Sequence, residues 1–414
     1  MTGKNILYAQ SGGPTAVINA SACGVIEAAR KLMPTAKIYA AKNGIIGVLN
    51  EELIDTSFES TEAIAGLKHT PASTFGSCRY QLKKMEQDDT EYRRLIDVFK
   101  AHDIGYFFYN GGGDSQDTAN KVSQLSQKMG YPMICIGIPK TIDNDLPITD
   151  SCPGFGSVAK YVAISTAEAA LDVKSMAASS TKVFILEVMG RHAGWIAAAA
   201  GLIKNEEGDP PHIILFPEIA FNEEKFLITV EAAVDRNGYC VIVASEGIRN
   251  AQGKFIQQSG LSDAFGHSQL GGIAPTLAEC IKHNLGYKYH WAVSDYLQRA
   301  AAHIASKTDV DQAYELGKAA IEYALKGVNS VMLTIKRESS TPYRWSIGTA
   351  SLSDVANIEA KMPKDFITEN GFSITEKCRE HMLPLIQGEH YPPYKNGLPQ
   401  YVVLKNKLIE KKLI

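Results

Sequence analysis

Short apolar runs alternate with longer amphipathic stretches along most of this 414-residue chain. The apolar runs have the length of strands, and a glycine-rich or charged loop follows most of them before helical periodicity begins. The predicted strands are Asn5–Gln10, Ile104–Tyr109, Met133–Ile138, Lys182–Val188, Ile213–Phe216 and Tyr239–Ala244. The predicted helices are Ala16–Leu32, Gln116–Met129 and His192–Ile203. This order predicts an α/β fold whose largely parallel sheets are covered by helices on both faces.

The polar loops all follow predicted strands. They read SGGP at 11–14, GGGDS at 111–115, PKTIDND at 139–145, MGR at 189–191 and SEG at 245–247. Because ligands of open α/β sheets bind beyond the carboxyl ends of the strands, these loops are expected to form one site.

Composition narrows the class of protein. The formal net charge of −3 lacks the basic excess of a nucleic-acid-binding protein, so no nucleic-acid partner is expected. The longest apolar stretch, Ile196–Ile203, is too short to cross a membrane, and the apolar run near the N-terminus is too short for a signal peptide. Seven cysteines without a CxxC pair indicate reduced thiols, as in a cytoplasmic protein.

The two glycine loops are candidate phosphate sites. Gly12 and Gly13 in the first, and Gly112 and Gly113 in the second, leave backbone N–H groups open to an anion near a helix N-terminus. An ordinary turn is the alternative for the first loop, and a helix cap by Asp114 is the alternative for the second. A carboxylate in a phosphate loop is unusual, because it repels phosphate unless a metal ion or a lysine intervenes.

The PKTIDND loop places Lys140, Asp143 and Asp145 after a buried strand. One aspartate can accept a proton from a substrate hydroxyl, and a second can bind Mg²⁺ through oxygen. A lysine can neutralise a phosphate. A solvated, capped turn is the alternative interpretation.

Three later motifs add candidate ligands. Arg191 at a strand-to-helix junction suits a phosphate or sugar oxygens, whereas His192 beside it suits capping or packing better than catalysis. Glu246 could accept hydrogen bonds from a sugar or belong to a solvated turn. Tyr296 and Arg299 fit one turn of amphipathic helix equally well.

Taken in order, SGG, FGSCR, GGGDS, PKTIDND, EVMGRHAGW, SEG and YLQR resemble the phosphofructokinase family over residues 5–335. The phrases GFSIT and PLIQGE in the tail are similar to those of its longer, pyrophosphate-dependent members. The resemblance implies two Rossmann-like parallel-sheet domains with the active site in the cleft between them, plus an irregular C-terminal extension. It also implies Mg²⁺-dependent phosphoryl transfer to the 1-hydroxyl of fructose 6-phosphate.

The resemblance also implies roles for individual residues. The implied donor ligands are Gly12, Gly13, Arg79, Gly112, Gly113, Asp114 and Lys140. The implied sugar-phosphate ligands are Thr141, Ile142, Asp143, Met189, Gly190, Arg191, Glu246, Tyr296, Arg299 and, from a neighbouring subunit, Lys182. The implied catalytic group is Asp143 as proton acceptor, supported by Asp145, Lys140 and Asp114.

The metal ligands stay open at this point. Gly113 stands where the family normally has an aspartate that binds Mg²⁺. Either Asp114 takes over part of this task, or the motif is shifted by one residue and Asp114 is the ligand itself. Asp145 is the second expected ligand.

The donor follows from two departures within the family. ATP-using relatives usually read GGDGS and PGTIDND, so Asp114 and Lys140 each replace a glycine. An aspartate would meet the extra phosphate of a nucleotide with like charge and lost volume, whereas a lysine would neutralise a two-phosphate donor. We therefore expect pyrophosphate as donor and a reaction that runs in both directions. An ATP-dependent enzyme and a non-catalytic regulatory subunit are the alternatives.

The expected organisation has three parts. Residues 1–145 would form a donor-binding domain completed by later segments, residues 146–335 a fructose-6-phosphate-binding domain, and residues 336–414 an extension that wraps the core with few strands. The family resemblance implies a homodimer or homotetramer. Lys182, where many relatives have arginine, keeps the charge that such an interface would use.

Overall fold

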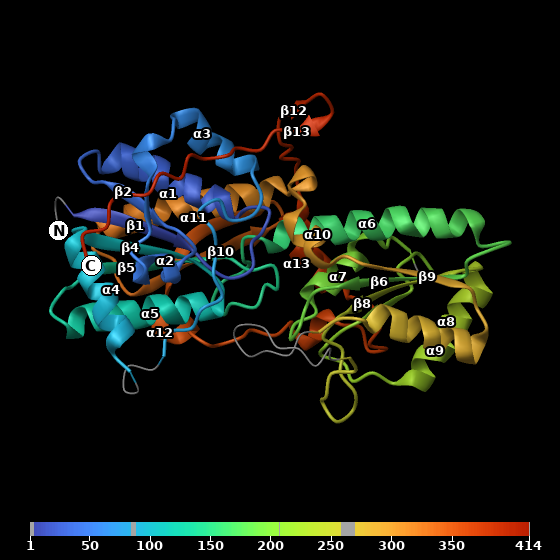
Figure 1. Cartoon of the computed structure of the whole chain (residues 1–414). Coiled ribbons are helices and arrows are strands. Elements are labelled where there is room, and N and C mark those ends of the chain that lie inside the picture. The colour runs from blue at the N-terminus through green and yellow to red at the C-terminus, as the bar shows by residue number, and fades with distance from the viewer. Residues whose placement is uncertain (1–3, 84–87, 207, 258–269, 414) are drawn as a thin grey trace.

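The computed structural model describes residues 4–83, 88–206, 208–257 and 270–413. Figure 1 shows two lobes side by side, each built on one sheet with helices on both faces. The observed fold is therefore of the predicted α/β class. None of the helices in the described part of the chain is long and apolar enough to span a membrane.

The first sheet has seven strands in the order β11-β10-β5-β4-β1-β2-β3. Their bounds are β1 Asn5–Gln10, β2 Ile38–Ala41, β3 Leu53–Asp55, β4 Ile104–Gly111, β5 Ile134–Pro139, β10 Val331–Ser340 and β11 Tyr343–Ser351. The five inner strands run parallel, and the edge strands β3 and β11 are antiparallel to their neighbours. Successive side chains of β1 alternate between two apolar cores, with Ile6 and Tyr8 on one face and Leu7 and Ala9 on the other.

Helices α1 Ile18–Leu32 and α11 Lys307–Leu325 cover one face of this sheet. These two helices cross closely, because a Cβ atom on Gly24 would lie 2.1 Å from the carbonyl oxygen of Tyr314. The opposite face carries α2 Ile45–Leu49, α4 Thr90–Ala101, α5 Gly113–Lys128 and α12 Leu352–Val355. The short helix α3 Thr61–Gly66 lies beside α1. Late residues thus complete a layer that begins at the N-terminus.

The second sheet has four parallel strands in the order β7-β8-β6-β9. Their bounds are β6 Val183–Val188, β7 Ile213–Leu215, β8 Cys240–Ser245 and β9 Tyr289–Val293. The covering helices are α6 Phe155–Met176, α7 Trp195–Ala199 and α13 Glu376–Met382 on one face, and α8 Glu223–Asn237 and α9 Ile273–Leu285 on the other. The short helix α10 Asp295–Ala300 follows β9 and leads back toward the first lobe.

Short elements complete the chain. The 3₁₀ turns are Thr56–Phe58, Leu67–His69, Ala200–Ile203, Ala302–Ile304, Lys364–Phe366 and Leu383–Ile386. A small hairpin pairs β12 Tyr394–Lys395 with β13 Leu398–Pro399.

Two predicted boundaries near the loops are wrong. The GGGDS segment is not all turn, since α5 begins at Gly113 and has Asp114 in its first turn, where a helix dipole favours negative charge. The helix predicted from His192 begins only at Trp195, because Gly194 donates its N–H to Glu218 Oε1 at 2.9 Å and stays in a turn.

The tail contains more sheet than expected. Strands β10 and β11 pair over most of their length, and β10 runs through residue 336 without a break. The predicted division into 1–145, 146–335 and 336–414 stays a prediction, while the sheet pairing assigns β10 and β11 to the first lobe.

Candidate active site

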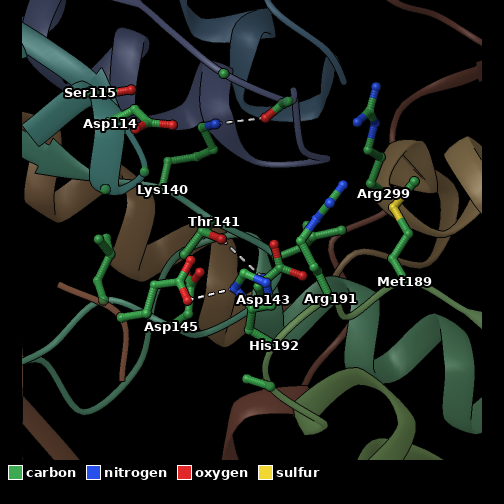
Figure 2. Close-up of a pocket in the computed structure, with 18 of the residues that line it drawn as sticks. Asp114, Ser115, Lys140, Thr141, Asp143, Asp145, Met189, Arg191, His192 and Arg299 are labelled. Atoms are coloured by element: carbon green, nitrogen blue, oxygen red, sulfur yellow. Dashed lines mark hydrogen bonds and ion pairs between the residues drawn. The ribbon is translucent and has the colours of Figure 1, made fainter. Parts of the chain in front are cut away.

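A cavity of about 930 Å³ lies where the carboxyl ends of the strands of the two sheets face each other. Figure 2 shows Asp114, Lys140 and Thr141 of the first lobe on one side, with Met189, Arg191 and Arg299 of the second lobe on the other. The predicted site residues in its wall are Gly12, Gly13, Arg79, Gly112, Gly113, Asp114, Lys140, Thr141, Ile142, Asp143, Asp145, Met189, Arg191, Glu246, Tyr296 and Arg299. Five strand-end loops thus converge on one cavity, as parallel sheets require.

The first glycine loop is surrounded by cationic side chains. Lys140 Nζ donates to the carbonyl oxygen of Gly13 at 2.6 Å. A Cβ atom on Gly12 would lie 3.2 Å from the same Nζ, and one on Gly13 would lie 2.9 Å from Nη1 of Arg299 and 3.8 Å from Nη2 of Arg79. Three cations therefore lie beside the backbone of this loop, and any side chain larger than that of glycine would contact them.

Lys140 is the most buried of these cations, with 3% of its surface exposed. Burial, together with the charges of the nearby Arg299 and Arg79, lowers the pKa of its ammonium group to about 7. An anion placed among the three side chains would relieve this repulsion. The electrostatics of this part of the cavity therefore favour a strongly negative ligand.

The N-terminus of α5 adds backbone donors to the same region. Gly112 and Gly113 open the helix, and Asp114 and Ser115 in its first turn also line the cavity. A Cβ atom on Gly113 would meet nothing within 4 Å, so open space lies in front of this helix end. Figure 2 shows Asp114 close to Lys140, at the edge of this space.

The PKTIDND loop, residues 139–145, is held in place by hydrogen bonds within it and to the segment that follows it. Asp143 donates its backbone N–H to Thr141 Oγ1 at 3.1 Å, and Asn144 Oδ1 accepts from the backbone N–H of Cys152 at 2.9 Å. Asn144 adopts a left-handed conformation with φ of 53°, which asparagine tolerates better than most residues. The turn directs Asp143 and Asp145 toward the cavity.

The carboxyl groups of this loop hold their protons unusually tightly. Burial, together with the charges of Asp145 and Glu246, raises the pKa of Asp143 to about 8. Burial also raises the pKa of Asp145, and the nearby Glu359 acts in the same direction. A carboxyl group with a raised pKa is a stronger base once it is deprotonated, as a proton acceptor needs to be.

The second lobe contributes Met189, Arg191 and Glu246. Gly190 lies between the first two with φ of 132°, and its carbonyl oxygen accepts a hydrogen bond from the hydroxyl of Ser245. Burial raises the pKa of Glu246, while the charge of Arg191 lowers it. The loops after β6 and β8 therefore hold an arginine and a glutamate side by side, as a ligand with both phosphate and hydroxyl groups would require.

Two predicted residues lie elsewhere. Within the described part of the chain, the cavity wall includes neither Gly190 nor Lys182. Gly190 shapes the loop from behind, because its Cβ atom would lie 2.8 Å from the carbonyl oxygen of Ala193. Lys182 precedes β6, at the end of the strand opposite the cavity, and donates to the carbonyl oxygen of Ala177.

Several cavity residues were not predicted from the sequence. Asn357, Ile358 and Glu359 come from the tail, Gln81 from another loop, and Asp295 from the first turn of α10. They belong to no recognisable motif, so only their three-dimensional packing reveals them.

His192 proved to be more than a packing residue. It lines the cavity, and its Nδ1 lies 2.6 Å from Glu359 Oε2. The adjacent Ala360 donates its backbone N–H to the carbonyl oxygen of Asp145 at 2.7 Å. The tail therefore forms part of the wall beside the PKTIDND loop.

The carboxylates of the cavity suit Mg²⁺. The described residues contain no cluster of three His, Cys, Asp or Glu side chains that would enclose a metal ion. Mg²⁺ does not require one, since it commonly binds one or two carboxylates together with substrate phosphates and water. Asp114, Asp143 and Asp145 all line the cavity and are of the required chemical type.

The sequence profile of the family named Phosphofructokinase matches residues 5–324. The chain belongs to the phosphofructokinase family. Over 414 residues, this phosphofructokinase is 64% identical to the pyrophosphate–fructose 6-phosphate 1-phosphotransferase of Halomonas elongata and covers 99% of that protein. It is 62% identical to the protein of the same name from Methylococcus capsulatus, again covering 99%.

A solved structure agrees with these sequence relatives. The crystal structure of the pyrophosphate-dependent phosphofructokinase from Marinobacter aquaeolei superimposes on this phosphofructokinase with a TM-score of 0.91 at 63% identity. The match covers 99% of this chain and 98% of that chain. The two-lobed arrangement predicted from the motifs is therefore confirmed as the phosphofructokinase fold.

Proposed function

We propose that this phosphofructokinase transfers a phosphoryl group between pyrophosphate and the 1-hydroxyl of fructose 6-phosphate, giving fructose 1,6-bisphosphate and phosphate. The observation that carries the proposal is the group of three cations, Lys140, Arg79 and Arg299, around the Gly12–Gly13 loop. This group suits a compact, highly charged donor. The relatives that share more than half of the sequence are named for the same reaction.

The donor subsite supports pyrophosphate over ATP. Asp114 borders the open space before α5, where it would oppose an additional phosphate by charge and volume. Lys140 supplies the compensating positive charge close to the shorter donor. The names of the close relatives favour pyrophosphate as well. A non-catalytic subunit is disfavoured, because Asp143, Arg191 and Arg299 are all present in the cavity.

The chemical step uses the catalytic loop. Asp143 accepts the proton of the 1-hydroxyl while the hydroxyl oxygen bonds to one phosphorus of pyrophosphate. The bond from that phosphorus to the bridging oxygen breaks, and phosphate is released. Lys140, Arg79 and the backbone N–H groups at the start of α5 stabilise the charge on the transferred group and on the leaving phosphate. In the reverse direction, Asp143 returns the proton. Its raised pKa suits both roles.

The sugar phosphate is assigned to the second lobe. Glu246 accepts hydrogen bonds from sugar hydroxyls, and Arg191 with Met189 forms the wall opposite the donor. Tyr296 and Arg299 bind the 6-phosphate, and the guanidinium group of Arg299 stacks 3.8 Å above the ring of Tyr296. Arg299 lies between the glycine loop and this subsite, so it is placed to contact both phosphate groups.

Mg²⁺ is the proposed cofactor. Asp114 and Asp145 would hold it, with oxygens of pyrophosphate and water completing its coordination. When bound, the ion would neutralise charge on the phosphates during transfer.

A homo-oligomer is proposed as the working form. The edge strand β9 and the following helix expose Trp291, Val293 and Leu297, an apolar surface that a second copy of the chain would cover. Lys182, immediately before the adjacent strand β6, would then contribute its charge to the partner's 6-phosphate subsite.

The decisive experiment compares phosphorylation of fructose 6-phosphate with pyrophosphate, ATP and polyphosphate under the same conditions. We expect turnover with pyrophosphate and at most traces with the other donors. Preference for ATP would refute the donor assignment, and the absence of turnover with all three would refute the reaction. Light scattering of the same sample would decide between monomer and oligomer.

A further inference from the structure

Residues 401–413 form an extended segment, here called the strap, that crosses the first lobe far from the catalytic loop. Figure 1 shows it running in red from the β12–β13 hairpin, past α3, to the outer edge of the first sheet. Backbone hydrogen bonds join it to the edge strand β3. Asp55 donates to the carbonyl oxygen of Lys407 at 3.0 Å, and Ile409 donates to that of Leu53 at 2.9 Å. The strap therefore covers an edge that would otherwise be open.

The end of the strap is fixed to a fully buried carboxylate. Glu51 Oε1 accepts a hydrogen bond from the backbone N–H of Lys412 at 2.6 Å and lies 2.6 Å from Nε2 of His102. Although burial alone would raise it, these hydrogen bonds hold the pKa of Glu51 below its ordinary value. This end of the strap is thus bound by charge-assisted contacts, which are stronger than neutral ones.

The start of the strap packs closely against the first lobe. Leu404 is 7% exposed and belongs to the same apolar core as Phe75, whereas Val403 beside it is 92% exposed. A Cβ atom on Gly66 would lie only 2.3 Å from Cγ2 of Val402. A close fit of this kind indicates a specific docking position rather than a loose covering.

Between these anchors, the strap contacts the loop that carries Arg79 into the cavity. Val402 donates its backbone N–H to Thr70 Oγ1 at 3.0 Å, and the side chain of Asn406 donates from Nδ2 to the carbonyl oxygen of Thr74 at 2.9 Å. The second of these contacts joins residues 332 positions apart in the sequence.

The same loop, residues 70–79, is bonded to the first glycine loop. Gly12 donates its backbone N–H to the carbonyl oxygen of Cys78 at 2.9 Å, and Ser77 Oγ donates to the carbonyl oxygen of Gly12 at 2.6 Å. A continuous path of hydrogen bonds and packing thus leads from Asn406 through Thr74 to Gly12 and Arg79.

We propose that the strap is a positioning device for the donor subsite, which it serves by fixing residues 70–79 against the Gly12–Gly13 loop. The inference rests on the proposed function in assigning this subsite to pyrophosphate. Loosening the strap displaces Arg79 and the glycine loop, while Arg191 and Glu246 in the other lobe keep their positions. The effect is therefore specific to the donor and does not extend to the sugar phosphate.

The test is Asn406→Gly. Asn406 has φ of 48°, so glycine accepts its backbone conformation while removing the donor to Thr74. The matched control is Asn396→Gly in the exposed β12–β13 turn, where the asparagine has φ of 51°. We expect N406G to raise the KM for pyrophosphate about three- to tenfold, the usual scale of one lost hydrogen bond. The KM for fructose 6-phosphate should stay within twofold, and N396G should match the wild type.

Two further measurements keep the proposal refutable. Amide hydrogen exchange should quicken within residues 70–79 in N406G and not in N396G, whatever the donor is. Gly66→Ala places a Cβ atom against Val402 and should push the strap outward, so it should also raise the KM for pyrophosphate. This rise is expected even though alanine stabilises helix α3 itself.

The outcomes separate clearly. Unchanged exchange and an unchanged pyrophosphate KM in N406G would overturn the proposal, as would an equal rise in both KM values or a loss of thermal stability alone. A wild type that does not use pyrophosphate would instead refute the proposed function, and hydrogen exchange would still decide whether the strap fixes the loop.

Discussion

The cavity has a donor wall around Lys140 and an acceptor wall around Asp143, and the pKa values of these two residues are shifted in opposite directions. The donor wall crowds Lys140, Arg79 and Arg299 together, and burial with this repulsion lowers the pKa of Lys140 to about 7. At the acceptor wall, burial and the charges of Asp145 and Glu246 raise the pKa of Asp143 to about 8. Each wall therefore weakens the charge of its key residue. The clustered cations of the donor wall favour an anionic ligand, whereas a carboxylate with a raised pKa favours a hydroxyl from which it can accept a proton.

The largest effect is expected at the acceptor wall. Asp143→Ser removes the proposed proton acceptor and should lower kcat by about 10²–10⁴-fold with little change in either KM. Steady-state assays with pyrophosphate measure this kcat directly. Pyrophosphate binding by calorimetry and the melting temperature should stay near wild type, and normal turnover in such a folded variant would contradict the assignment.

The donor wall should respond differently. Lys140→Met keeps an unbranched chain but removes the charge, and kcat/KM for pyrophosphate should fall about 30- to 1000-fold. The matched control is Lys160→Met, because Lys160 is also a buried lysine that donates to a backbone carbonyl, that of Gly388 at 2.7 Å. K160M should lose stability without a selective loss of pyrophosphate use, and an equal donor defect in both variants would refute a specific role for Lys140.

The contributions of the two walls to activity should also depend on pH in opposite directions. Asp143 must be deprotonated to accept a proton, so its contribution rises with pH, whereas Lys140 must be protonated to bind phosphate, so its contribution falls as pH rises. Between about pH 6 and 9, the wild-type kcat/KM should be bell-shaped. K140M should lose the fall at high pH and keep the rise. A profile that keeps both limbs would remove Lys140 from the donor wall.

The arginines sharpen the comparison further. Arg191→Ala should raise the KM for fructose 6-phosphate about tenfold or more and leave that for pyrophosphate unchanged, since a charged hydrogen bond is lost on one side only. Arg299→Ala should raise both, because this guanidinium group lies beside Gly13. The pair of KM values for each variant decides the question, and a purely donor-side loss in R299A would remove it from the 6-phosphate subsite.

The smallest effect concerns donor choice. Asp114→Gly should uncover partial ATP activity and weaken pyrophosphate use modestly, because it opens space without supplying an adenine pocket. The kcat/KM ratio for the two donors measures the change. If both donors suffer equally, Asp114 acts only as a metal ligand and does not select the donor, as a one-residue shift of the motif would imply.

The sequence was most informative where chemistry follows a strand. SGGP, PKTIDND and SEG could be assigned to one cavity because parallel strands bring their carboxyl ends to a common edge. Asn357, Glu359 and Gln81 could not, since their positions depend on long-range packing with no local pattern. The bounds of α5 and α7 were misjudged because glycine permits both turn and helix. Lys182 lies at the end of β6 opposite the cavity of its own chain, so the role proposed for it requires a neighbouring copy.

The close crossing of α1 and α11 has a consequence for how the chain is made. The second sheet pairs only segments between residues 183 and 293, whereas the first lacks α11, β10 and β11 until residue 351 has been synthesised. At the usual pace of translation, the small-residue face of α1 stays uncovered for on the order of tens of seconds. The sheet that begins first is therefore completed last, and the nascent chain must keep this apolar face from premature association until its partner helix emerges.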